Sequence, residues 1–372
     1  MRLTFAISSL SCGGAERALS VLANSLDSLG YQVTVITIDT PASDFYQLRD
    51  GVARVSLGML NKSANLGAAF YHNFRRLHAL RQSIIASRPD AVIGFMSRTS
   101  VLSIEACLGL PIPVIASEQL DPRMGREGRM WELQRKMAYP RLAALVSASH
   151  GVDGFFSWLP AFKRHVIPNP LADVAQLAET KPAFHLNHGR KHIISMGRLV
   201  GQKGFDLLIE AFSALRDGFP NVDLTILGEG PERRTLEELV ARKGLTNRVF
   251  LPGQVDVPFP ILRQADLFVL SSRFEGFGNV LCEALACGLP VVSFACPSGP
   301  AEIIRDGVDG VLVPPEDVDS LTQTMTRLMA DDAERTRLAA CATEGASRFG
   351  AQVVVARWED LLKNVTAGKI RK

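Results

Sequence analysis

The sequence lacks the patterns that mark a membrane-spanning, metal-binding or disulfide-bonded chain. No apolar run reaches the roughly 18 uncharged residues that a transmembrane helix needs. The six cysteines are scattered without Cys-x2-Cys spacing. The apolar residues 3–7 are too few for a secretory signal and lead straight into a glycine turn. We therefore expect a cytoplasmic protein with reduced thiols, no structural metal and a strand at its start.

The sequence also lacks low-complexity segments and a strong excess of charge. Of its 372 residues, 47% are hydrophobic and 21% are charged, and the net charge is +3. A chain of this length and composition is expected to form two globular domains. The charge is uneven, because residues 1–170 carry 18 basic against 12 acidic residues and the remainder carries 23 against 26. The first half is therefore the basic half.

Two segments hold much of this basic excess, residues 70–81 and residues 123–136. In both, arginine is interleaved with aromatic or apolar residues, which suits the surface of an anionic membrane, where each basic residue contributes about 1 kcal/mol. A solvated helix face is the alternative, and the sequence leaves both interpretations open. Nucleic acid is not an expected partner, because the excess is small and no nucleic-acid module is present.

Apolar strands alternate with longer amphipathic segments along the whole chain. This pattern predicts the α/β class, with doubly wound parallel sheets covered by helices on both faces. The expected strands lie at residues 3–9, 32–38, 91–95, 114–117, 144–148, 191–196, 223–227, 248–251, 267–271, 291–294 and 310–313. After the fifth strand, Pro168-Asn169-Pro170 and a polar stretch up to residue 191 suit a linker. We therefore expect two doubly wound α/β domains, residues 1–167 and 168–349, whose ligands bind at the carboxyl ends of the strands.

The most informative stretch is residues 271–284, which joins a buried strand to a helix. Two carboxylates, Glu275 and Glu283, bracket the turn between these elements. Gly278 lets the backbone come close to a ligand. The amides at the helix start are expected to point outward, where anions bind, and belong to Asn279, Val280 and Leu281. Such a turn can hold phosphate and polyol hydroxyls together.

Residues 271–284 resemble the Glu-x7-Glu signature of retaining glycosyltransferases of the family 4 type, which transfer a sugar from a nucleotide diphosphate donor on a GT-B fold. The segments 288–293, 299–304 and 307–313 also resemble that family's C-terminal half in order and spacing. The resemblance implies two Rossmann-like domains that face each other across a cleft, the first for the acceptor and the second for the nucleotide sugar. It also implies that the helical residues 350–372 pack back on the first domain.

Arg198 and Lys203 match that family's diphosphate-binding pair, on the loop that follows the sixth strand. A planar guanidinium and a compact ammonium could hold both phosphates and stabilise the growing charge of the leaving group without metal. By the same resemblance, Glu275 faces the donor sugar and Glu283 accepts hydrogen bonds from the ribose hydroxyls. The alternatives are an exposed basic loop and a carboxylate that only complements a helix dipole.

Three further loops resemble segments of the family that contact donor or acceptor. Gly14 belongs to a glycine pair after the first strand, for which an ordinary tight turn is the alternative. Gly228 lies in a loop that would line the nucleotide pocket, and Val255 lies in a segment whose backbone would read the base. Arg233 occupies the third glycine position of a nicotinamide fingerprint, which argues against that cofactor. The tripeptide Asp317-Val318-Asp319 begins an amphipathic helix, so we expect helix capping there and no metal site.

One segment departs from the family's pattern. Many relatives carry a histidine near the donor-sugar and acceptor interface, whereas this chain has Glu118. We expect Glu118 to orient the acceptor or to assist proton removal, and a structural turn residue is the alternative. His150 is a second candidate, for which we favour a structural role.

The resemblance implies a retaining, metal-independent hexosyltransferase that needs no cofactor, with Glu275, Arg198, Lys203 and Glu118 as catalytic residues. We expect it to move a hexose or an N-acetylhexosamine from a UDP-sugar to a lipid-linked or growing surface glycan, on the inner face of the cytoplasmic membrane. Attack from the front side, with the diphosphate assisting proton removal, is carried over from the family. The alternatives are another GT-B enzyme, such as a UDP-sugar epimerase, and a nonenzymatic nucleotide-sugar-binding protein.

Overall fold

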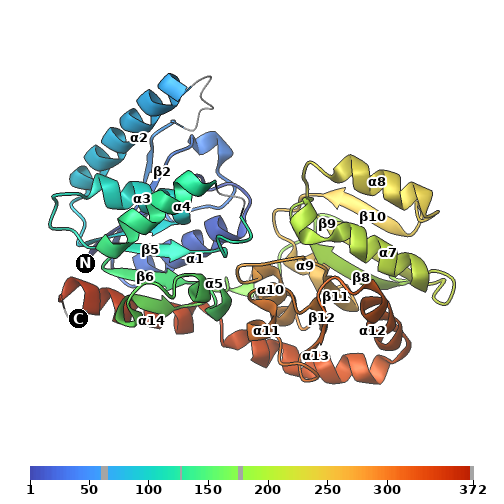
Figure 1. The fold of residues 1–372 in the computed structure, drawn as a ribbon. Helices are drawn as coiled ribbons and strands as arrows, with labels where there is room; N and C mark the ends of the chain where they lie inside the picture. The colour runs from blue at the N-terminus through green and yellow to red at the C-terminus, as the bar shows by residue number, and fades with distance from the viewer. Residues whose placement is uncertain (60–65, 126–127, 175–178, 369–372) are drawn as a thin grey trace. The chain divides into compact units, whose positions relative to one another are not determined.

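The computed structural model describes residues 1–59, 66–125, 128–174 and 179–368. The chain divides into two compact units, one formed by Met1–Pro170 together with the chain from Ala351 and the other by Leu171–Gly350 (Figure 1). The expected domain boundaries, after residues 167 and 349, lie close to these junctions. Parts of the expected linker and last helix, residues 175–178 and 369–372, lie outside the described residues.

The first unit is built on a seven-stranded parallel sheet with the order β3-β2-β1-β4-β5-β6-β7. Its strands are β1 (Arg2–Ile7), β2 (Gln32–Thr37), β3 (Ala53–Ser56), β4 (Ala91–Phe95), β5 (Val114–Glu118), β6 (Ala144–Ser147) and β7 (Arg164–Val166). The strand order reverses between β1 and β4, which pair directly, and this is the doubly wound arrangement that the sequence predicts. Two short strands at the edges, β3 and β7, were not among the expected strands.

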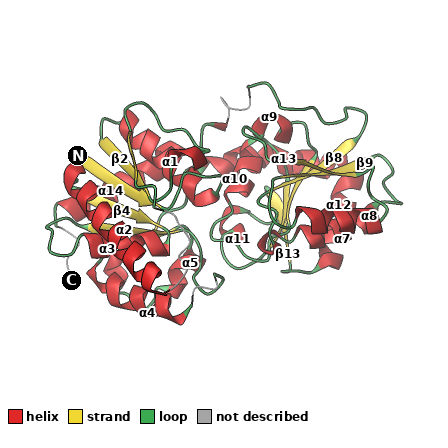
Figure 2. Cartoon of the chain, turned by 90° about the horizontal axis from the view of Figure 1, so that it is seen from above, coloured by secondary structure: helices red, strands yellow, loops and turns green. Residues whose placement is uncertain are grey.

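Helices cover both faces of this sheet, which Figure 2 shows as a yellow layer between red helices. They are α1 (Gly14–Ser28), α2 (Leu66–Ser87), α3 (Ser97–Ala106), α4 (Arg129–Ala138), α5 (His150–Phe155) and α14 (Ala351–Thr366). The C-terminal helix α14 belongs to this unit, because Trp358 and Leu362 are buried in one core with Phe5 and Leu19. The apolar stripes of α2, α3 and α5 pack in a second core on the other face.

The second unit is built on a six-stranded parallel sheet with the order β10-β9-β8-β11-β12-β13. Its strands are β8 (Lys191–Met196), β9 (Val222–Leu227), β10 (Val249–Gly253), β11 (Leu267–Leu270), β12 (Val291–Phe294) and β13 (Gly310–Val313). Its helices are α7 (Phe205–Leu215), α8 (Arg233–Arg242), α9 (Phe259–Leu262), α10 (Asn279–Ala286), α11 (Pro300–Ile303), α12 (Val318–Ala330) and α13 (Asp332–Ser347). The order reverses between β8 and β11, so the loops after these two strands lie beside each other at the carboxyl edge.

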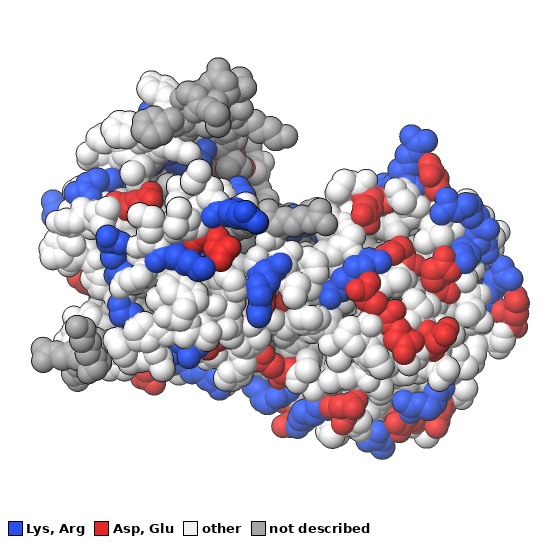
Figure 3. Space-filling model, in the orientation of Figure 1, with Lys and Arg blue, Asp and Glu red and all other residues white. Residues whose placement is uncertain are grey.

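Charged side chains differ between the two units, as the sequence predicts. On the face shown in Figure 3, basic side chains are spread over the first unit with few acidic ones, whereas both signs are mixed over the second unit. In the second unit, Arg233 at the start of α8 pairs with Glu229 in the preceding loop and with Glu237 on the same helix. The first unit therefore presents the larger excess of positive charge.

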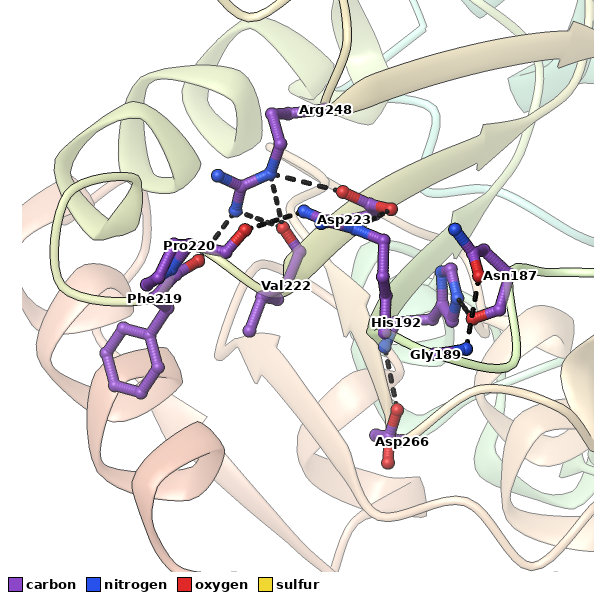
Figure 4. A network of polar contacts seen from close by, with 10 residues as sticks. Asn187, Gly189, His192, Phe219, Pro220, Val222, Asp223, Arg248 and Asp266 are labelled. Atoms are coloured by element: carbon purple, nitrogen blue, oxygen red, sulfur yellow. Dashed lines mark hydrogen bonds and ion pairs between the residues drawn. The ribbon is translucent and has the colours of Figure 1, made fainter.

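A buried ionic cluster fastens the amino edge of the second sheet (Figure 4). The Asp223 carboxylate, on β9, accepts hydrogen bonds from Nε of Arg190 at 2.6 Å and from Nε of Arg248 at 3.1 Å. These arginines stand just before β8 and β10, so the carboxylate joins three neighbouring strands where they begin. The backbone amide of His192 donates to Asp266 at 2.7 Å and ties β8 to the start of β11. These structural charges thus hold together the amino edge of the second sheet.

Neither membrane-spanning helices nor clustered metal ligands are found in the described parts of the chain. Among the described residues, none of the helices combines the length and the apolar character that crossing a bilayer requires. Within those ranges, no three His, Cys, Asp or Glu side chains are grouped to hold a metal ion. All six cysteines are free thiols. The Asp317 side chain caps α12 by accepting from the Ser320 amide at 2.9 Å, which confirms the capping interpretation of this acidic tripeptide.

Candidate active site

The candidate site lies at the carboxyl edge of the second sheet, on three loops that follow β8, β9 and β11. The first loop carries Arg198 and Lys203, the second carries Gly228, and the third carries Glu275 and leads into α10. β8 lies between β9 and β11 in the sheet, so the three loops are direct neighbours. Their proximity is therefore a consequence of the strand order and not of their positions in the sequence.

The loops after β8 and β9 approach each other so closely that only glycine fits between them. The backbone of Gly228 has φ +146°, and a Cβ atom there would lie 1.9 Å from the Gly197 carbonyl oxygen. A Cβ atom on Gly230 would lie 2.4 Å from the Leu199 carbonyl oxygen. The amide of Leu199 also donates to the Glu229 carbonyl at 2.9 Å. These contacts give the loop that carries Arg198 a fixed path.

The loop after β8 is also fastened to the loop after β11. Gly204 has φ +59°, and a Cβ atom there would lie 2.0 Å from the Ser271 carbonyl oxygen. The Ser271 hydroxyl donates to the Lys203 carbonyl at 3.0 Å, and Nε2 of the Gln202 side chain donates to the Phe274 carbonyl at 2.9 Å. The backbone of Lys203 is thus held directly against the loop that bears Glu275.

At the centre of the site, Lys203 and Glu275 form a buried ion pair. Nζ of Lys203 donates to Oε1 of Glu275 at 2.6 Å, although 72 positions separate the two residues in the sequence. The Ser272 hydroxyl donates to the same oxygen, also at 2.6 Å. The two charged side chains are 17% and 8% exposed, so each depends on the other for compensation of its lost hydration. The structure therefore brings together two of the residues that the sequence singles out.

A third group, which the sequence does not indicate, lies beside this pair. Cys296 follows β12 and is buried. Burial, reinforced by the negative charge of Glu275, raises the pKa of the Cys296 thiol to about 12, while Lys203 acts in the opposite direction. The thiol therefore stays protonated near neutral pH and adds no charge to the site. No local sequence pattern signals this neighbour, because it comes from a different strand of the sheet.

Helix α10 starts directly after Gly278, whose φ of +106° requires glycine. Asn279, Val280 and Leu281 form its first turn, as expected. One detail corrects the expectation of three outward amides, because the Leu281 amide donates to the Gly278 carbonyl at 2.9 Å. The sequence predicts Glu283 at the beginning of this helix. In the structure Glu283 is instead the fifth residue of α10 and is buried. This position weakens the alternative that Glu283 only complements the helix dipole.

The remaining predicted residues of the second unit lie around this centre. Arg198 is exposed and makes no ion pair with any residue that the structure describes, which leaves its guanidinium available. The amide of Gly228 donates to the Gly253 carbonyl at 2.9 Å, which joins the ends of β9 and β10. Val255 follows β10 and is half-buried.

Arg273 is a supporting residue to which the sequence analysis gave no role. Its guanidinium donates to both carboxylate oxygens of Asp206, at 2.9 and 2.7 Å, and to the Gly201 carbonyl at 2.7 Å. The hydrogen bonds to Asp206 raise the pKa of Arg273, which keeps this side chain charged. Arg273 thus links the start of α7 to the loop of Glu275. The sequence signal for Arg273 is its position within residues 271–284, the stretch that carries the family resemblance.

Two predicted residues, Gly14 and Glu118, belong to the first unit. Gly14 is the first residue of α1. Glu118 ends β5 and is buried, where Oε2 accepts a hydrogen bond from the Ser97 hydroxyl at 2.9 Å and Oε1 accepts one from the Tyr139 hydroxyl. Burial and the nearby Glu118 charge raise the pKa of Tyr139 well above its usual value. This geometry favours the structural alternative for Glu118 over a role in proton removal. The second candidate, His150, is exposed at the start of α5.

Comparison with known protein families matches both units. Residues 13–170 match the glycosyl transferase 4-like domain, and residues 178–344 match the glycosyl transferases group 1 domain. The two matched ranges together span most of the chain.

Two curated proteins show how far these similarities extend. An exopolysaccharide phosphotransferase of Streptomyces coelicolor is 40% identical over 178 residues, which are 48% of this chain and 19% of that protein. The chain therefore matches only about a fifth of that relative's length. The GalNAc-alpha-(1->4)-GalNAc-alpha-(1->3)-diNAcBac-PP-undecaprenol alpha-1,4-N-acetyl-D-galactosaminyltransferase of Campylobacter jejuni is 27% identical over 371 residues, which are 98% of this chain and 99% of that protein.

Solved structures share the fold at low sequence identity. Sucrose-phosphate synthase from Thermosynechococcus elongatus has a TM-score of 0.83 at 19% identity, covering 99% of this chain and 100% of that chain. HepE of Anabaena in complex with UDP has a TM-score of 0.78 at 20% identity, covering 98% of this chain and 100% of that chain. The structural neighbours are GT-B glycosyltransferases, which confirms the GT-B fold that the sequence resemblance implies.

Proposed function

Because this chain belongs to the glycosyltransferases of the GT-B fold, we propose that it transfers a hexose or an N-acetylhexosamine from a UDP-sugar to a lipid-linked or growing surface glycan. The observation that carries the proposal is the buried Lys203–Glu275 pair, which lies at the carboxyl edge of the second sheet. The exposed Arg198 extends from the same loop as Lys203. Two cations and a carboxylate can thus meet a negatively charged group and an attached sugar.

Names of similar proteins support the choice of donor and acceptor. The HepE structure of Anabaena is described as a complex with UDP, and a further one as a complex with UDP-glucose. The relative from Campylobacter jejuni is named for an acceptor linked to undecaprenol through PP. We carry a UDP-sugar and a lipid-linked or polysaccharide acceptor over to this chain on that basis.

The chemistry asks the site to stabilise a leaving group. The bond between C1 of the sugar and the phosphate oxygen breaks, a bond from C1 to the acceptor oxygen forms, and UDP leaves with an additional negative charge. Arg198 and Lys203 would offset that charge electrostatically. Glu275 would accept hydrogen bonds from the donor sugar and Glu283 from the ribose. The backbone near Gly228, Val255, Asn279 and Val280 would border the nucleotide.

The proposed stereochemistry is retention at C1, by attack of the acceptor from the side that the leaving group departs. In this scheme the acceptor proton goes to an oxygen of the departing diphosphate, so no protein base is required. This assignment fits the hydrogen bonds of Glu118, which engage both of its oxygens within the first unit. We also propose that the cations replace a metal and that no cofactor takes part.

The test is a transfer assay with purified protein, a panel of UDP-sugars and a polyprenyl-diphosphate-linked acceptor, run in excess chelator. We expect transfer with the C1 configuration of the donor kept in the product. Arg198→Ala should lower kcat/KM by about 10²-fold. Inversion at C1, or activity that disappears with chelator and returns with a metal, would refute this mechanism. Isomerisation or release of the donor without acceptor would favour an epimerase.

A basic, partly apolar surface on the first unit supports contact with an anionic membrane at the inner face of the cytoplasmic membrane. Met130, Leu133 and Met137 project from one face of α4 and are 71%, 57% and 63% exposed. Arg129 and Lys136 lie on the same helix and are exposed, although Lys136 pairs with Glu132 at 3.1 Å. An apolar stripe flanked by cations is the arrangement of a helix that lies in a membrane surface. Residues 126 and 127 of the predicted basic segment lie outside the described residues.

Vesicle sedimentation tests this contact. Vesicles rich in phosphatidylglycerol should bind the protein more tightly than phosphatidylcholine vesicles, and added salt should weaken the binding. Changing Met130, Leu133 and Met137 to serine should abolish the binding of the protein to these vesicles. A matched control changes Phe250 and Val308, which are 44% and 41% exposed on the second unit. Equal binding by the two sets of variants would rule out α4 as the contact.

A further inference from the structure

Ser272 and Lys203 donate hydrogen bonds to a single oxygen of Glu275. Both donors lie 2.6 Å from Oε1, and Oε2 makes no hydrogen bond with the residues that the structure describes. Ser272 is fully buried, so its hydroxyl has no access to solvent. The carboxylate is therefore held through one oxygen, while its other oxygen keeps the capacity to accept.

The two donors would respond differently to a phosphate group. An ammonium is a mobile point charge on a flexible stem, so an arriving diphosphate competes with Glu275 for Lys203. The Ser272 hydroxyl is neutral and buried, and it lies in the same turn as Glu275, three residues before it. When Lys203 turns toward phosphate, Ser272 is the donor that still holds Oε1.

We propose that Ser272 is a positioning residue that anchors Oε1 of Glu275 during donor binding, so that Oε2 stays directed at a hydroxyl of the donor sugar. This inference rests on the proposed function, because it assigns the Glu275 carboxylate to the sugar. It predicts that Ser272 acts on the sugar part of the donor and leaves the recognition of UDP unchanged. Ser272 thereby contributes to the discrimination between a UDP-sugar and UDP.

The surroundings of Glu275 leave few other groups to take over this task. Its backbone amide donates to the Pro297 carbonyl at 2.9 Å, which fixes the main chain but not the carboxylate. The Cys296 thiol nearby has a pKa of about 12, because it is buried and lies near Glu275. It stays neutral and is a weak donor. Removal of the serine hydroxyl should therefore not be compensated locally.

The experiment compares UDP with the UDP-sugar that the wild-type protein uses, chosen from UDP-glucose, UDP-galactose, UDP-N-acetylglucosamine and UDP-N-acetylgalactosamine. Calorimetry gives both dissociation constants, and the transfer assay gives kcat and KM. For Ser272→Ala we expect an unchanged constant for UDP, a constant for the UDP-sugar weakened by about tenfold and a lower kcat, since a hydrogen bond to a charged group is lost. Ser272→Thr, which keeps the hydroxyl, should show the wild-type preference for the UDP-sugar over UDP.

Ser271→Ala is the matched control, because this neighbouring hydroxyl is equally buried but donates to the Lys203 carbonyl at 3.0 Å. This variant should weaken the binding of UDP and of the UDP-sugar by the same factor, since it shifts Lys203 and not the Glu275 carboxylate. Glu275→Gln combined with Ser272→Ala should lose no more than Glu275→Gln alone, because both changes act on one contact. If the alanine protein does not fold, Ser272→Cys keeps nearly the same volume with a weaker donor and provides the measurement.

The outcomes separate the inference from the proposed function. A wild-type protein that binds neither UDP nor any of the four UDP-sugars would overturn both. A wild-type protein that binds and transfers, combined with a Ser272→Ala variant whose preference for the UDP-sugar over UDP is unchanged, would overturn only the role of Ser272. Equal losses for both ligands in this variant would also overturn it, because they would indicate a general structural defect.

Discussion

Nζ of Lys203 lies 2.6 Å from Oε1 of Glu275 in a site where the two side chains are only 17% and 8% exposed. Folding removes the Lys203 ammonium and the Glu275 carboxylate from water together, and each charge compensates the lost hydration of the other. An ion pair of this kind is costly to break from one side, because the remaining charge stays buried. The Lys203–Glu275 pair therefore also contributes to the stability of the second unit.

Lys203→Ala should destabilise the protein by about 3 kcal/mol, because it leaves the Glu275 carboxylate with the Ser272 hydrogen bond alone. The double variant Lys203→Met with Glu275→Gln should recover most of this loss, since no buried charge remains. Urea unfolding of the wild type and the two variants measures both effects. A single variant as stable as the wild type would contradict the burial of the pair.

Gly204→Ala should cost about 3 kcal/mol or more, because φ is +59° there and the new Cβ atom would lie 2.0 Å from the Ser271 carbonyl oxygen. Gly30→Ala is the matched control. Its φ is +85° with nothing within 4 Å of the new atom, so only backbone strain of about 1 kcal/mol is expected. Thermal unfolding of both variants gives the difference. Equal losses at the two positions would show that the loops after β8 and β11 are not in contact.

The contact between α14 and the rest of the first unit should make stability depend on pH in alkaline solution. The Tyr31 hydroxyl donates to Oε1 of Glu359 at 2.8 Å, and burial together with this carboxylate raises the pKa of Tyr31 from 10.0 to about 12. Because the folded state holds this proton more tightly, its contribution is complete below pH 10 and is lost as the pH rises from 10 to 12.

Tyr31→Phe isolates that contribution from the other groups that titrate in alkali. The difference in unfolding free energy between wild type and variant should be constant from pH 8 to about pH 10 and then shrink toward pH 12. Urea unfolding at fixed pH values measures it. A difference that grows with pH would contradict the hydrogen bond to Glu359.

Glu118→Gln tests whether this residue takes part in proton removal. Its oxygens accept from Ser97 and Tyr139 in a buried network, so the change should lower the unfolding free energy by about 1–3 kcal/mol. We expect kcat to fall less than about tenfold, whereas loss of a general base costs about 10²-fold or more. Steady-state kinetics and thermal unfolding on the same samples decide. A loss of about 10²-fold in kcat at unchanged stability would return Glu118 to the catalytic residues.

Much of the fold could be predicted from the sequence because its signals are local. Buried strands such as β4 and β11 are short apolar runs, and each is followed by a segment with helical periodicity. The strands β3 and β7 were missed because they lack such a local apolar signal. They lie at the sheet edges, most of their residues are half-buried, and residues such as Arg54 and His165 give them no apolar run.

The sequence by itself determined the residue types at the loops after β8, β9 and β11, the glycines that shape them and the helix that begins after Gly278, because each depends on neighbours along the chain. Only the tertiary structure decided that Lys203 meets Glu275 across 72 positions, that Cys296 lies beside them and that Glu118 is enclosed by Ser97 and Tyr139. Hydrogen bonds and ion pairs act over about 3 Å, so they depend on which strands are neighbours. Strand order is set by the packing of whole helices and sheets, which no single motif encodes.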